Sequence, residues 1–289
     1  MRRWRNKMAV AVMAIAMIGT LAGCGGTAKK GTTSEQITTN NQTGEDTSLS
    51  LVQQRGEFIL GLDASFPPMG FTNEKNEIVG YDIDLAKEVC ERMGVELKIQ
   101  PINWDSKQQE LDTKNIDCIW NGFTVDEERK KSMTVSDAYM ENHQVLVVKA
   151  DSSYKTKEDL AGKVVELQKG STAAAALDSE ENKEFKDSLA DTILIADNVK
   201  AMMDLGTGCD AVLMDEVVAN YYLAQNEGKY RILEEALSDE EYVIGFRKGE
   251  EALKDEVENQ LKAMVADGTM SEIDNKWFGK DVSTIANEE

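Results

Sequence analysis

The stretch NGFTVDEER, residues 121–129, decides which fold and which binding site are predicted for this chain. It follows a short apolar run typical of a buried strand, and it leads into the first turn of a helix capped by Asp126 or Thr124. Gly122 lets a ligand approach the backbone, Thr124 offers a hydroxyl, and Arg129 offers two parallel N–H groups to a carboxylate. The pattern predicts a compact anion site, and it is equally typical of a surface turn with a solvated arginine.

Two other stretches place polar groups at strand ends. The sequence QKGST, residues 168–172, joins an apolar strand to an alanine-rich helix. Free N–H groups at this helix start, beside the hydroxyls of Ser171 and Thr172, indicate either a second anion site or a plain N-cap. Asp215 ends another apolar strand and opens a helix, so its carboxylate is expected at the edge of a cleft, or as an N-cap.

These motifs closely resemble those of the polar amino-acid substrate-binding proteins of ABC importers, extracellular solute-binding proteins of family 3. That family carries the same glycine, hydroxyl and arginine in the same order and spacing, although it usually has Thr or Ser where this chain has Asp126. The resemblance implies a two-lobed α/β protein with the periplasmic-binding-protein type II fold and two hinge strands. It also covers residues 60–71, 80–89, 162–172, 210–215 and 242–279.

The resemblance implies a role for each part of the site. Arg129 and the second anion site hold the α-carboxylate of an amino acid, and Asp215 holds its α-ammonium group. Either charge would be costly to bury alone, whereas a zwitterion supplies both countercharges. The ligand-binding residues expected in this way are Asp63, Phe66, Trp104, Asn121, Gly122, Thr124, Arg129, Gln168, Ser171, Thr172, Met214 and Asp215.

The side chain of the ligand is expected to lie between Phe66 and Trp104. Aromatic faces hold an aliphatic stem or stack on a planar amide or guanidinium. The carboxylate of Asp63 can accept hydrogen bonds from an amide or from a cation. A neutral ligand such as glutamine or cystine and a basic one such as arginine, lysine or histidine therefore both fit, and we weigh the neutral option slightly higher.

Apolar runs alternate with amphipathic segments along the body of the chain, which predicts an α/β architecture. One predicted helix has Leu253, Val257, Leu261 and Met264 on a single stripe and ends at Gly268. The resemblance supplies the domain boundaries: lobe 1 at residues 55–138 plus 243–282, lobe 2 at 144–237, hinge crossings at 139–143 and 238–242, and an acidic tail at 283–289.

The first residues predict export and anchoring. A basic start and a short apolar segment, residues 1–23, are typical of a signal peptide and too short for a membrane span of ~20 residues. Small residues leading to Cys24 resemble the bacterial lipoprotein box, in which that cysteine is acylated; an ordinary signal peptide with an incidental cysteine is the alternative. Residues 24–54 are poor in apolar side chains and are expected to form a flexible tether.

Charge and cysteine content narrow the class further. The formal net charge of −21 over 289 residues excludes non-specific nucleic-acid binding. Cys90, Cys118 and Cys209 match no metal motif, and buried free thiols are favoured over a Cys90–Cys118 bridge. A monomer without metal or cofactor is expected.

The function implied is that of a lipid-anchored extracytoplasmic protein that captures a polar or basic L-amino acid. It would deliver this amino acid to an ABC permease and its ATPase. A surface amino-acid sensor and an enzyme similar to cyclohexadienyl dehydratase remain as alternatives on the same scaffold, and no acid–base pair stands out as catalytic.

Overall fold

The computed structural model of the protein describes residues 45–286. The expected export signal, Cys24 and the tether up to residue 44 lie outside these residues. The described chain alternates strands and helices, in agreement with the predicted α/β class.

The strands are β1 (Glu57–Leu62), β2 (Ser65–Phe66), β3 (Gly70–Thr72), β4 (Ile78–Val79), β5 (Glu96–Pro101), β6 (Cys118–Thr124), β7 (Met133–Val135), β8 (Met140–Lys149), β9 (Val164–Gln168), β10 (Asp191–Ile195), β11 (Ala211–Asp215) and β12 (Tyr230–Arg247). The α-helices are α1 (Ser48–Arg55), α2 (Tyr81–Met93), α3 (Lys107–Asp112), α4 (Glu127–Ser132), α5 (Thr172–Asp178), α6 (Lys183–Ser188), α7 (Asn198–Asp204), α8 (Glu216–Gln225), α9 (Glu251–Asp267) and α10 (Thr269–Phe278). Short 3-10 helices are η1 (Trp104–Ser106), η2 (Lys157–Leu160) and η3 (Glu180–Asn182).

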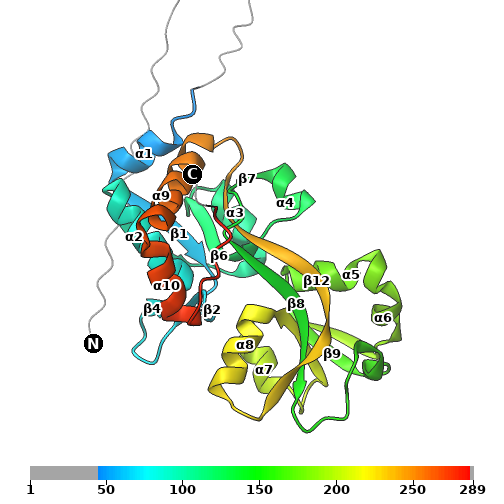
Figure 1. Cartoon of the computed structure of the whole chain (residues 1–289). Helices are drawn as coiled ribbons and strands as arrows, with labels where there is room; N and C mark the ends of the chain where they lie inside the picture. Colours follow the sequence, from blue (N-terminus) through cyan, green and yellow to red (C-terminus); the bar gives the residue numbers. More distant parts are fainter. Residues whose placement is uncertain (1–44, 287–289) are drawn as a thin grey trace, which may run out of the picture. The chain divides into compact units, whose positions relative to one another are not determined.

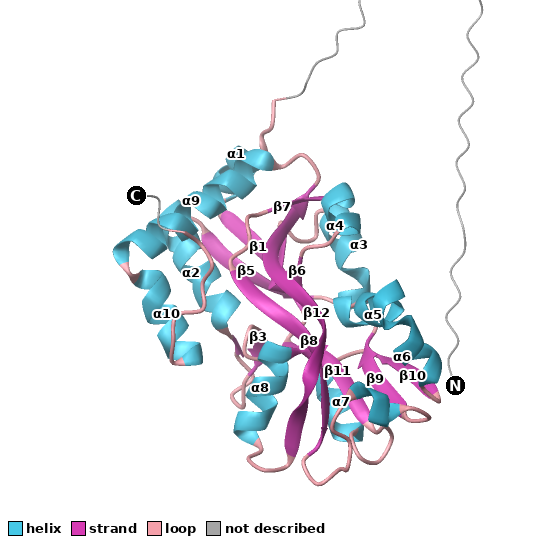
Figure 2. Cartoon of the chain, turned by 45° about the vertical axis from the view of Figure 1, so that its right-hand side comes forward, coloured by secondary structure: helices cyan, strands magenta, loops and turns pink. Residues whose placement is uncertain are grey.

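The main sheet has the strand order β10-β9-β11-β8-β12-β6-β1-β5, and β7 pairs with β12. Parallel strands form its two ends, whereas β8 and β12 run antiparallel to each other in the middle. We call the half that contains β1, β5 and β6 lobe 1, and the half that contains β9, β10 and β11 lobe 2. Figures 1 and 2 show β8 and β12 passing between the two lobes, with helices on both sides of the sheet.

The two expected hinge crossings pair with each other. Asp239 lies opposite His143, Glu240 opposite Asn142, and Tyr242 opposite Met140. Beyond Tyr242, β12 continues along β6 in antiparallel register. The chain therefore returns to lobe 1 through β12, and side chains from both crossings meet where the lobes join.

Helices α2, α9 and α10 cover lobe 1 (Figure 1). The buried side chains of α9 are Leu253, Val257, Leu261 and Met264, the predicted stripe, and the helix ends at Gly268 in the left-handed conformation. These side chains belong to the largest apolar core, which also contains side chains of β1, β6 and β12.

The tether expected at residues 24–54 is wrong at its C-terminal end, because residues 48–55 form α1 and pack on lobe 1. Val52 is buried, which stabilises this contact by roughly 1.5–3 kcal/mol. Asp46 accepts a hydrogen bond from the Ala252 N–H at 2.6 Å, and the Ser48 hydroxyl accepts one from the Leu253 N–H at 3.1 Å. These side chains cap the first turn of α9 from a distant part of the chain.

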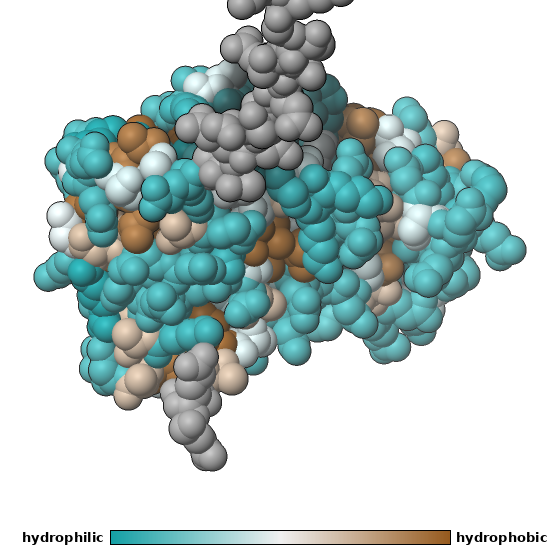
Figure 3. All heavy atoms as spheres, turned by 90° about the horizontal axis from the view of Figure 1, so that it is seen from above, coloured by the Kyte–Doolittle hydropathy of each residue, from teal (hydrophilic) through white to brown (hydrophobic). Residues whose placement is uncertain are grey.

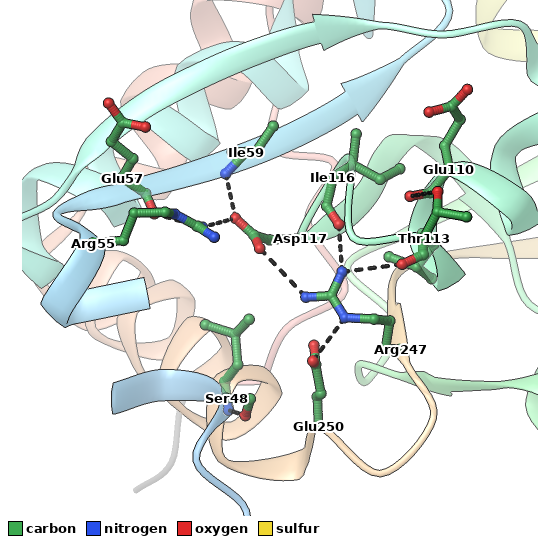
Figure 4. Close-up of polar contacts among 12 residues, drawn as sticks. Ser48, Arg55, Glu57, Ile59, Glu110, Thr113, Ile116, Asp117, Arg247 and Glu250 are labelled. Atoms are coloured by element: carbon green, nitrogen blue, oxygen red, sulfur yellow. Dashed lines mark hydrogen bonds and ion pairs between the residues drawn. The ribbon is translucent and has the colours of Figure 1, made fainter. Parts of the chain in front are cut away.

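The buried carboxylate of Asp117 links α1 to the sheet through hydrogen bonds (Figure 4). Asp117 accepts hydrogen bonds from Arg55, from the Ile59 N–H at 2.7 Å and from Arg247 at 3.3 Å. Arg247 also pairs with Glu250 at 2.7 Å. The cluster thus joins the end of α1, the strands β1 and β12, and the start of α9.

The body also extends further at its other end than expected. Ser283 forms a bridge with Met140, and the Thr284 N–H donates to the Tyr139 carbonyl at 3.0 Å. Ile285 packs against the large core. Residues 283–286 are therefore part of the body and not of a free tail, and residues 287–289 lie outside the described part.

Residues 121–124, which the sequence placed after the predicted strand, form the end of β6, a strand in which every residue is buried. Gly122 has φ +55°, and the pairing of β6 with β12 shifts register between Val243 and Gly245. A Cβ at Gly122 would lie 2.9 Å from a ring carbon of Phe66, so both conformation and space require glycine there. A register shift of this kind is typical of a β-bulge, which bends a strand and increases its twist locally.

The surface is largely hydrophilic on the face shown in Figure 3, with small apolar areas. Within residues 45–286, no helix has both the length and the apolar character needed to cross a membrane. Cys90, Cys118 and Cys209 are free thiols and are buried, as favoured from the sequence.

Candidate functional site

A narrow cavity lies where the two lobes meet, and every residue that lines it was expected from the sequence. The lining residues are Phe66, Trp104, Gly122, Thr124 and Arg129 from lobe 1, and Gln168, Ser171, Thr172 and Asp215 from lobe 2. The cavity has a volume of about 10 Å³, counted as the space open to the centre of a water molecule. It therefore holds about one water. An amino acid could enter only after the lobes move apart.

Arg129 enters the cavity from the first turn of α4. Asp126 caps this helix by accepting the Arg129 N–H at 2.7 Å, so the cap needs no hydroxyl here. The guanidinium donates from Nη1 to the Thr124 carbonyl, lies 4.3 Å from the centre of the Phe123 ring, and pairs through Nε with Asp126 at 3.3 Å. Burial lowers the pKa of Arg129, and the negative charges of Asp126, Glu240 and Asp215 oppose this shift only in part.

Asp215 carries the opposite charge on the lobe 2 side. It accepts hydrogen bonds from Asn142 at 2.8 Å and from the Tyr242 hydroxyl at 2.7 Å, both on Oδ1. Burial raises the pKa of Asp215 to about 7, and the negative charge of Glu240 adds to this shift. Within residues 45–286, no arginine or lysine forms an ion pair with Asp215, whereas Arg129 pairs with Asp126.

The second anion site differs from a plain N-cap. Ser171 occupies the N-cap position of α5, but its hydroxyl donates to the Gln168 carbonyl at 2.7 Å and accepts no N–H of the helix. The Thr172 hydroxyl points to lobe 1, where it donates to the Thr124 hydroxyl at 3.3 Å. The N–H groups of the first turn of α5 therefore lack a side-chain cap from Ser171 beside the cavity.

Gln168 lines the cavity, and Asp63 lies behind it. Gln168 donates to Asp63 Oδ2 at 2.6 Å across the two lobes, and the Ser65 N–H donates to Asp63 Oδ1 at 3.0 Å. Burial raises the pKa of Asp63, and the negative charge of Asp197 contributes to this shift. Phe66 and Trp104 line the cavity and are almost fully buried.

Further contacts hold the lobes together at the rim. Lys107 of α3 donates to the Gly170 carbonyl of lobe 2 at 2.8 Å, and Lys169 pairs with Asp105 at 2.7 Å. Burial lowers the pKa of Lys107 to about 8, and the positive charge of Arg129 acts in the same direction. The structure therefore shows the two lobes closed on each other.

Three expected residues do not line the cavity. Asp63 lies behind Gln168, and Asn121 accepts the Asp63 N–H at 2.9 Å, so it positions that residue. Met214 is buried in the large apolar core.

Several polar residues that hold the site were not found from the sequence. Asp82 accepts the Gly122 N–H at 2.8 Å and the Tyr139 hydroxyl at 2.9 Å, and burial raises its pKa to about 7. Asn142 and Gln144 come from β8, and Glu240 and Tyr242 come from β12. Only the acidic start of α2, within a segment that matches the family, could have indicated Asp82; the others required knowledge of the register between β8 and β12.

Comparisons with known proteins agree with this geometry. Residues 58–280 match the model of the bacterial extracellular solute-binding proteins, family 3. L-cystine-binding protein TcyJ of Escherichia coli (strain K12) is 31% identical over 238 residues, which cover 81% of this chain and 87% of that protein. ABC transporter arginine-binding protein 1 of the same strain is 32% identical over 224 residues, covering 75% of this chain and 89% of that protein.

A solved structure is similar over most of the chain. It is an ABC uptake transporter substrate-binding protein from Streptococcus pneumoniae with bound histidine, 36% identical. The match has a TM-score of 0.80 and covers 84% of this chain and all of that chain.

Proposed function

Because this chain belongs to the bacterial extracellular solute-binding proteins of family 3, we propose that it captures an L-amino acid outside the cell membrane and delivers it to an ABC importer. Its fold is that of the type II periplasmic binding proteins, with two lobes of parallel strands joined by β8 and β12. The relatives that transport amino acids support this proposal.

The observation that carries the proposal is a pair of charged groups of opposite sign that line one cavity and form no ion pair with each other. Arg129 comes from lobe 1 and Asp215 from lobe 2, and both line the space between the lobes. Burial shifts the pKa of each group toward its neutral form, so a zwitterion would relieve both penalties at once. The α-carboxylate would bind Arg129 and the start of α5, and the α-ammonium group would bind Asp215.

The surroundings of Asp63 favour a cationic ligand over a neutral one, whereas the sequence alone led us to weigh the neutral option slightly higher. Asp63 is a buried carboxylate that accepts hydrogen bonds from Ser65 and Gln168, and within residues 45–286 it pairs with no arginine or lysine. Asp197 of lobe 2 adds a second negative charge nearby. A guanidinium, ammonium or imidazolium group would supply the missing positive charge, with its stem between Phe66 and Trp104. The ligand class we propose is arginine, lysine or histidine.

Ligand capture would couple to hinge motion. The two halves of the site lie on different lobes, and the closed cavity holds about one water. The paired crossings of β8 and β12 are the elements that would bend as the lobes separate.

Anchoring at Cys24 remains part of the proposal. An acylated Cys24 and the residues before α1 would tether the body to the outer face of the cell membrane, near the permease. Cys24→Ser should abolish incorporation of a labelled fatty acid while the purified body binds amino acids as before. Label that persists on this variant would rule out lipidation at Cys24.

The direct test of the function uses residues 45–289 as a soluble protein. Thermal shift against all common amino acids should show a gain with basic amino acids, and a ligand at 100 times its Kd adds about 2.7 kcal/mol of stability. Calorimetric titration then gives the affinity, and Arg129→Ala serves as the matched control. A body that folds but binds none of these amino acids would contradict the proposal.

A further inference from the structure

Glu240 of β12 accepts hydrogen bonds from several polar groups near Asp215, the proposed partner of the ligand ammonium group. We call this part of the site the ammonium end. Its Oε2 accepts hydrogen bonds from the Thr124 hydroxyl at 2.8 Å, from Gln144 at 2.9 Å and from Asn142 at 3.1 Å. These donors come from lobe 1 and from β8, whereas Glu240 itself lies on β12. Glu240 is half-buried and does not line the cavity, so it acts through its neighbours.

The direction of the hydrogen bonds around Glu240 is fixed by chemistry. An ionised carboxylate only accepts, so the hydroxyl proton of Thr124 must point to Glu240 and away from the cavity. Thr124 in turn accepts from Thr172 at 3.3 Å, and Thr172 accepts from Gln144 at 3.4 Å. Gln144 thus closes a ring of donors that ends on Glu240.

The side-chain amides of Asn142 and Gln144 also indicate that the hydrogen bonds to Glu240 are maintained. Asn142 Nδ2 bridges Glu240 and Asp215, while its Oδ1 accepts the Val217 N–H at 3.4 Å. Gln144 is fully buried, and its Oε1 has no hydrogen-bond partner within the described residues. A flipped Gln144 would set its oxygen against Glu240, so the amide keeps its donor on the carboxylate although an acceptor is left unpaired.

We propose that Glu240 is a positioning residue of the ammonium end: it makes Thr124 an acceptor and adds negative charge behind Asp215, so that the site selects a charged α-ammonium group. This inference rests on the proposed amino-acid binding. With its proton committed to Glu240 and one hydrogen bond accepted from Thr172, Thr124 Oγ1 can accept one more N–H, so its hydroxyl does not serve the ligand carboxylate as expected from the sequence. A ligand that bears a hydroxyl in place of the ammonium group gains less from the same surroundings.

Proton linkage gives a second consequence. In the unliganded protein, burial and the charge of Glu240 raise the pKa of Asp215 to about 7, so a fraction of Asp215 is protonated at pH 7. The ionisable groups that face it are Glu240 and Tyr242 of β12 and Arg129 of α4, whereas β8 contributes the uncharged Asn142 and Gln144. An ammonium group requires the ionised carboxylate, so binding at pH 7 should release protons.

The experiment compares Glu240→Gln with the wild type by calorimetric titration. The probes are L-arginine and argininic acid, in which a hydroxyl replaces the α-ammonium group, with L-glutamine and its 2-hydroxy analogue as a second pair. Glu240→Gln should weaken the affinity for L-arginine about ten- to a hundred-fold. It should change the affinity for argininic acid by less than about three-fold. Titrations in phosphate and in Tris at pH 7 should also show that the variant releases fewer protons per bound arginine.

Glu241→Gln is the matched control. It makes the same charge change one residue along β12, at an exposed side chain, and should leave affinity and proton release unchanged. Thr124→Val removes the hydroxyl through which Glu240 acts, so it should lower the same selectivity, and the double variant should lose less than the sum of the two. Thr124→Val decides the outcome if Glu240→Gln fails to fold.

The possible outcomes separate the two claims. Equal losses for both probes, or no loss for either, would overturn the role of Glu240 while amino-acid binding stands. A folded wild-type body that binds neither L-arginine nor L-glutamine would overturn the proposed function and this inference together.

Discussion

Two clusters, each with arginine and a buried aspartate, differ in how their charges are balanced. In the Asp117 cluster, Arg55 and Arg247 both contact the carboxylate, which also accepts the Ile59 N–H (Figure 4). In the cavity, Arg129 and Asp215 form no ion pair with each other. Both clusters join elements that are distant in sequence, but only the first is complete without a ligand.

The difference indicates which cluster stabilises the fold and which one binds. A buried charge that loses its partner is strongly destabilising, so the Asp117 cluster must remain intact for lobe 1 to hold α1 and α9. The charges of the cavity carry a cost in the free protein that a zwitterion removes. Changes in the first cluster should therefore alter stability, and changes in the second should alter affinity.

Arg129→Ala should have the largest effect on affinity. The ligand carboxylate would lose its countercharge, which costs roughly 2–5 kcal/mol, or about thirty-fold to several thousand-fold in Kd. Arg129→Lys should lose less, because it keeps the charge without the parallel hydrogen bonds. Calorimetric titration measures both, with circular dichroism to verify folding. A folded Arg129→Ala protein with unchanged affinity would remove the proposed carboxylate site.

Asp117→Ala should instead lower stability, by about 3 kcal/mol, because Arg247 keeps only Glu250 as a partner and the Ile59 N–H loses its acceptor. Arg55 is partly exposed and can be solvated, which limits the loss. Urea denaturation of residues 45–289 gives the free energy of unfolding. Affinity for L-arginine should change little under conditions in which the variant is folded. A large loss of affinity without a loss of stability would reverse the assignment of the two clusters.

Asp215→Asn should make the free protein more stable at pH 8 but not at pH 4. Burial raises the pKa of Asp215 from its ordinary value near 4 to about 7 in the folded protein. The folded state therefore binds the proton more tightly, and the wild type loses this contribution as pH rises through 7. Asparagine carries no such penalty, so the gain should be about 1 kcal/mol or more at pH 8. Equal stability differences at both pH values would show that Asp215 is not desolvated in this way.

Ser48→Ala should have the smallest effect, about 1 kcal/mol of stability, because α9 loses a cap supplied by α1. Ser50→Ala is a suitable control, since that hydroxyl bonds only locally to the Thr47 carbonyl at 2.9 Å. Thermal unfolding distinguishes the two variants. Identical midpoints would mean that α1 does not stabilise lobe 1 through this contact.

The α/β class and the family could be predicted from the sequence because their signals are local. Apolar periodicity gave the stripe of α9, and the strand-to-helix junctions placed Arg129, Thr172 and Asp215 at the edge of the sheet. The resemblance to family 3 is confirmed by the match over residues 58–280.

The errors arose where long-range contacts override composition. Residues 48–55 look like a tether because they are polar, yet Val52, Ser48 and Arg55 each find a partner far along the chain. The strand β6 was predicted to end before Asn121, because glycine and polar residues are depleted in strands. These residues remain in β6 because the strand is paired between β1 and β12. The position of Glu240 beside the site follows only from the register between β8 and β12.

The central property of the proposed site is that it recognises both charges of an α-amino acid. Titration of the wild-type body with L-arginine, with agmatine, which lacks the α-carboxylate, and with Nα-acetyl-arginine, which lacks the α-ammonium charge, tests this claim without any mutation. L-arginine should bind at least about a hundred-fold more tightly than either analogue, which corresponds to about 2.7 kcal/mol for each lost charge. Agmatine or Nα-acetyl-arginine binding as tightly as L-arginine would contradict the account.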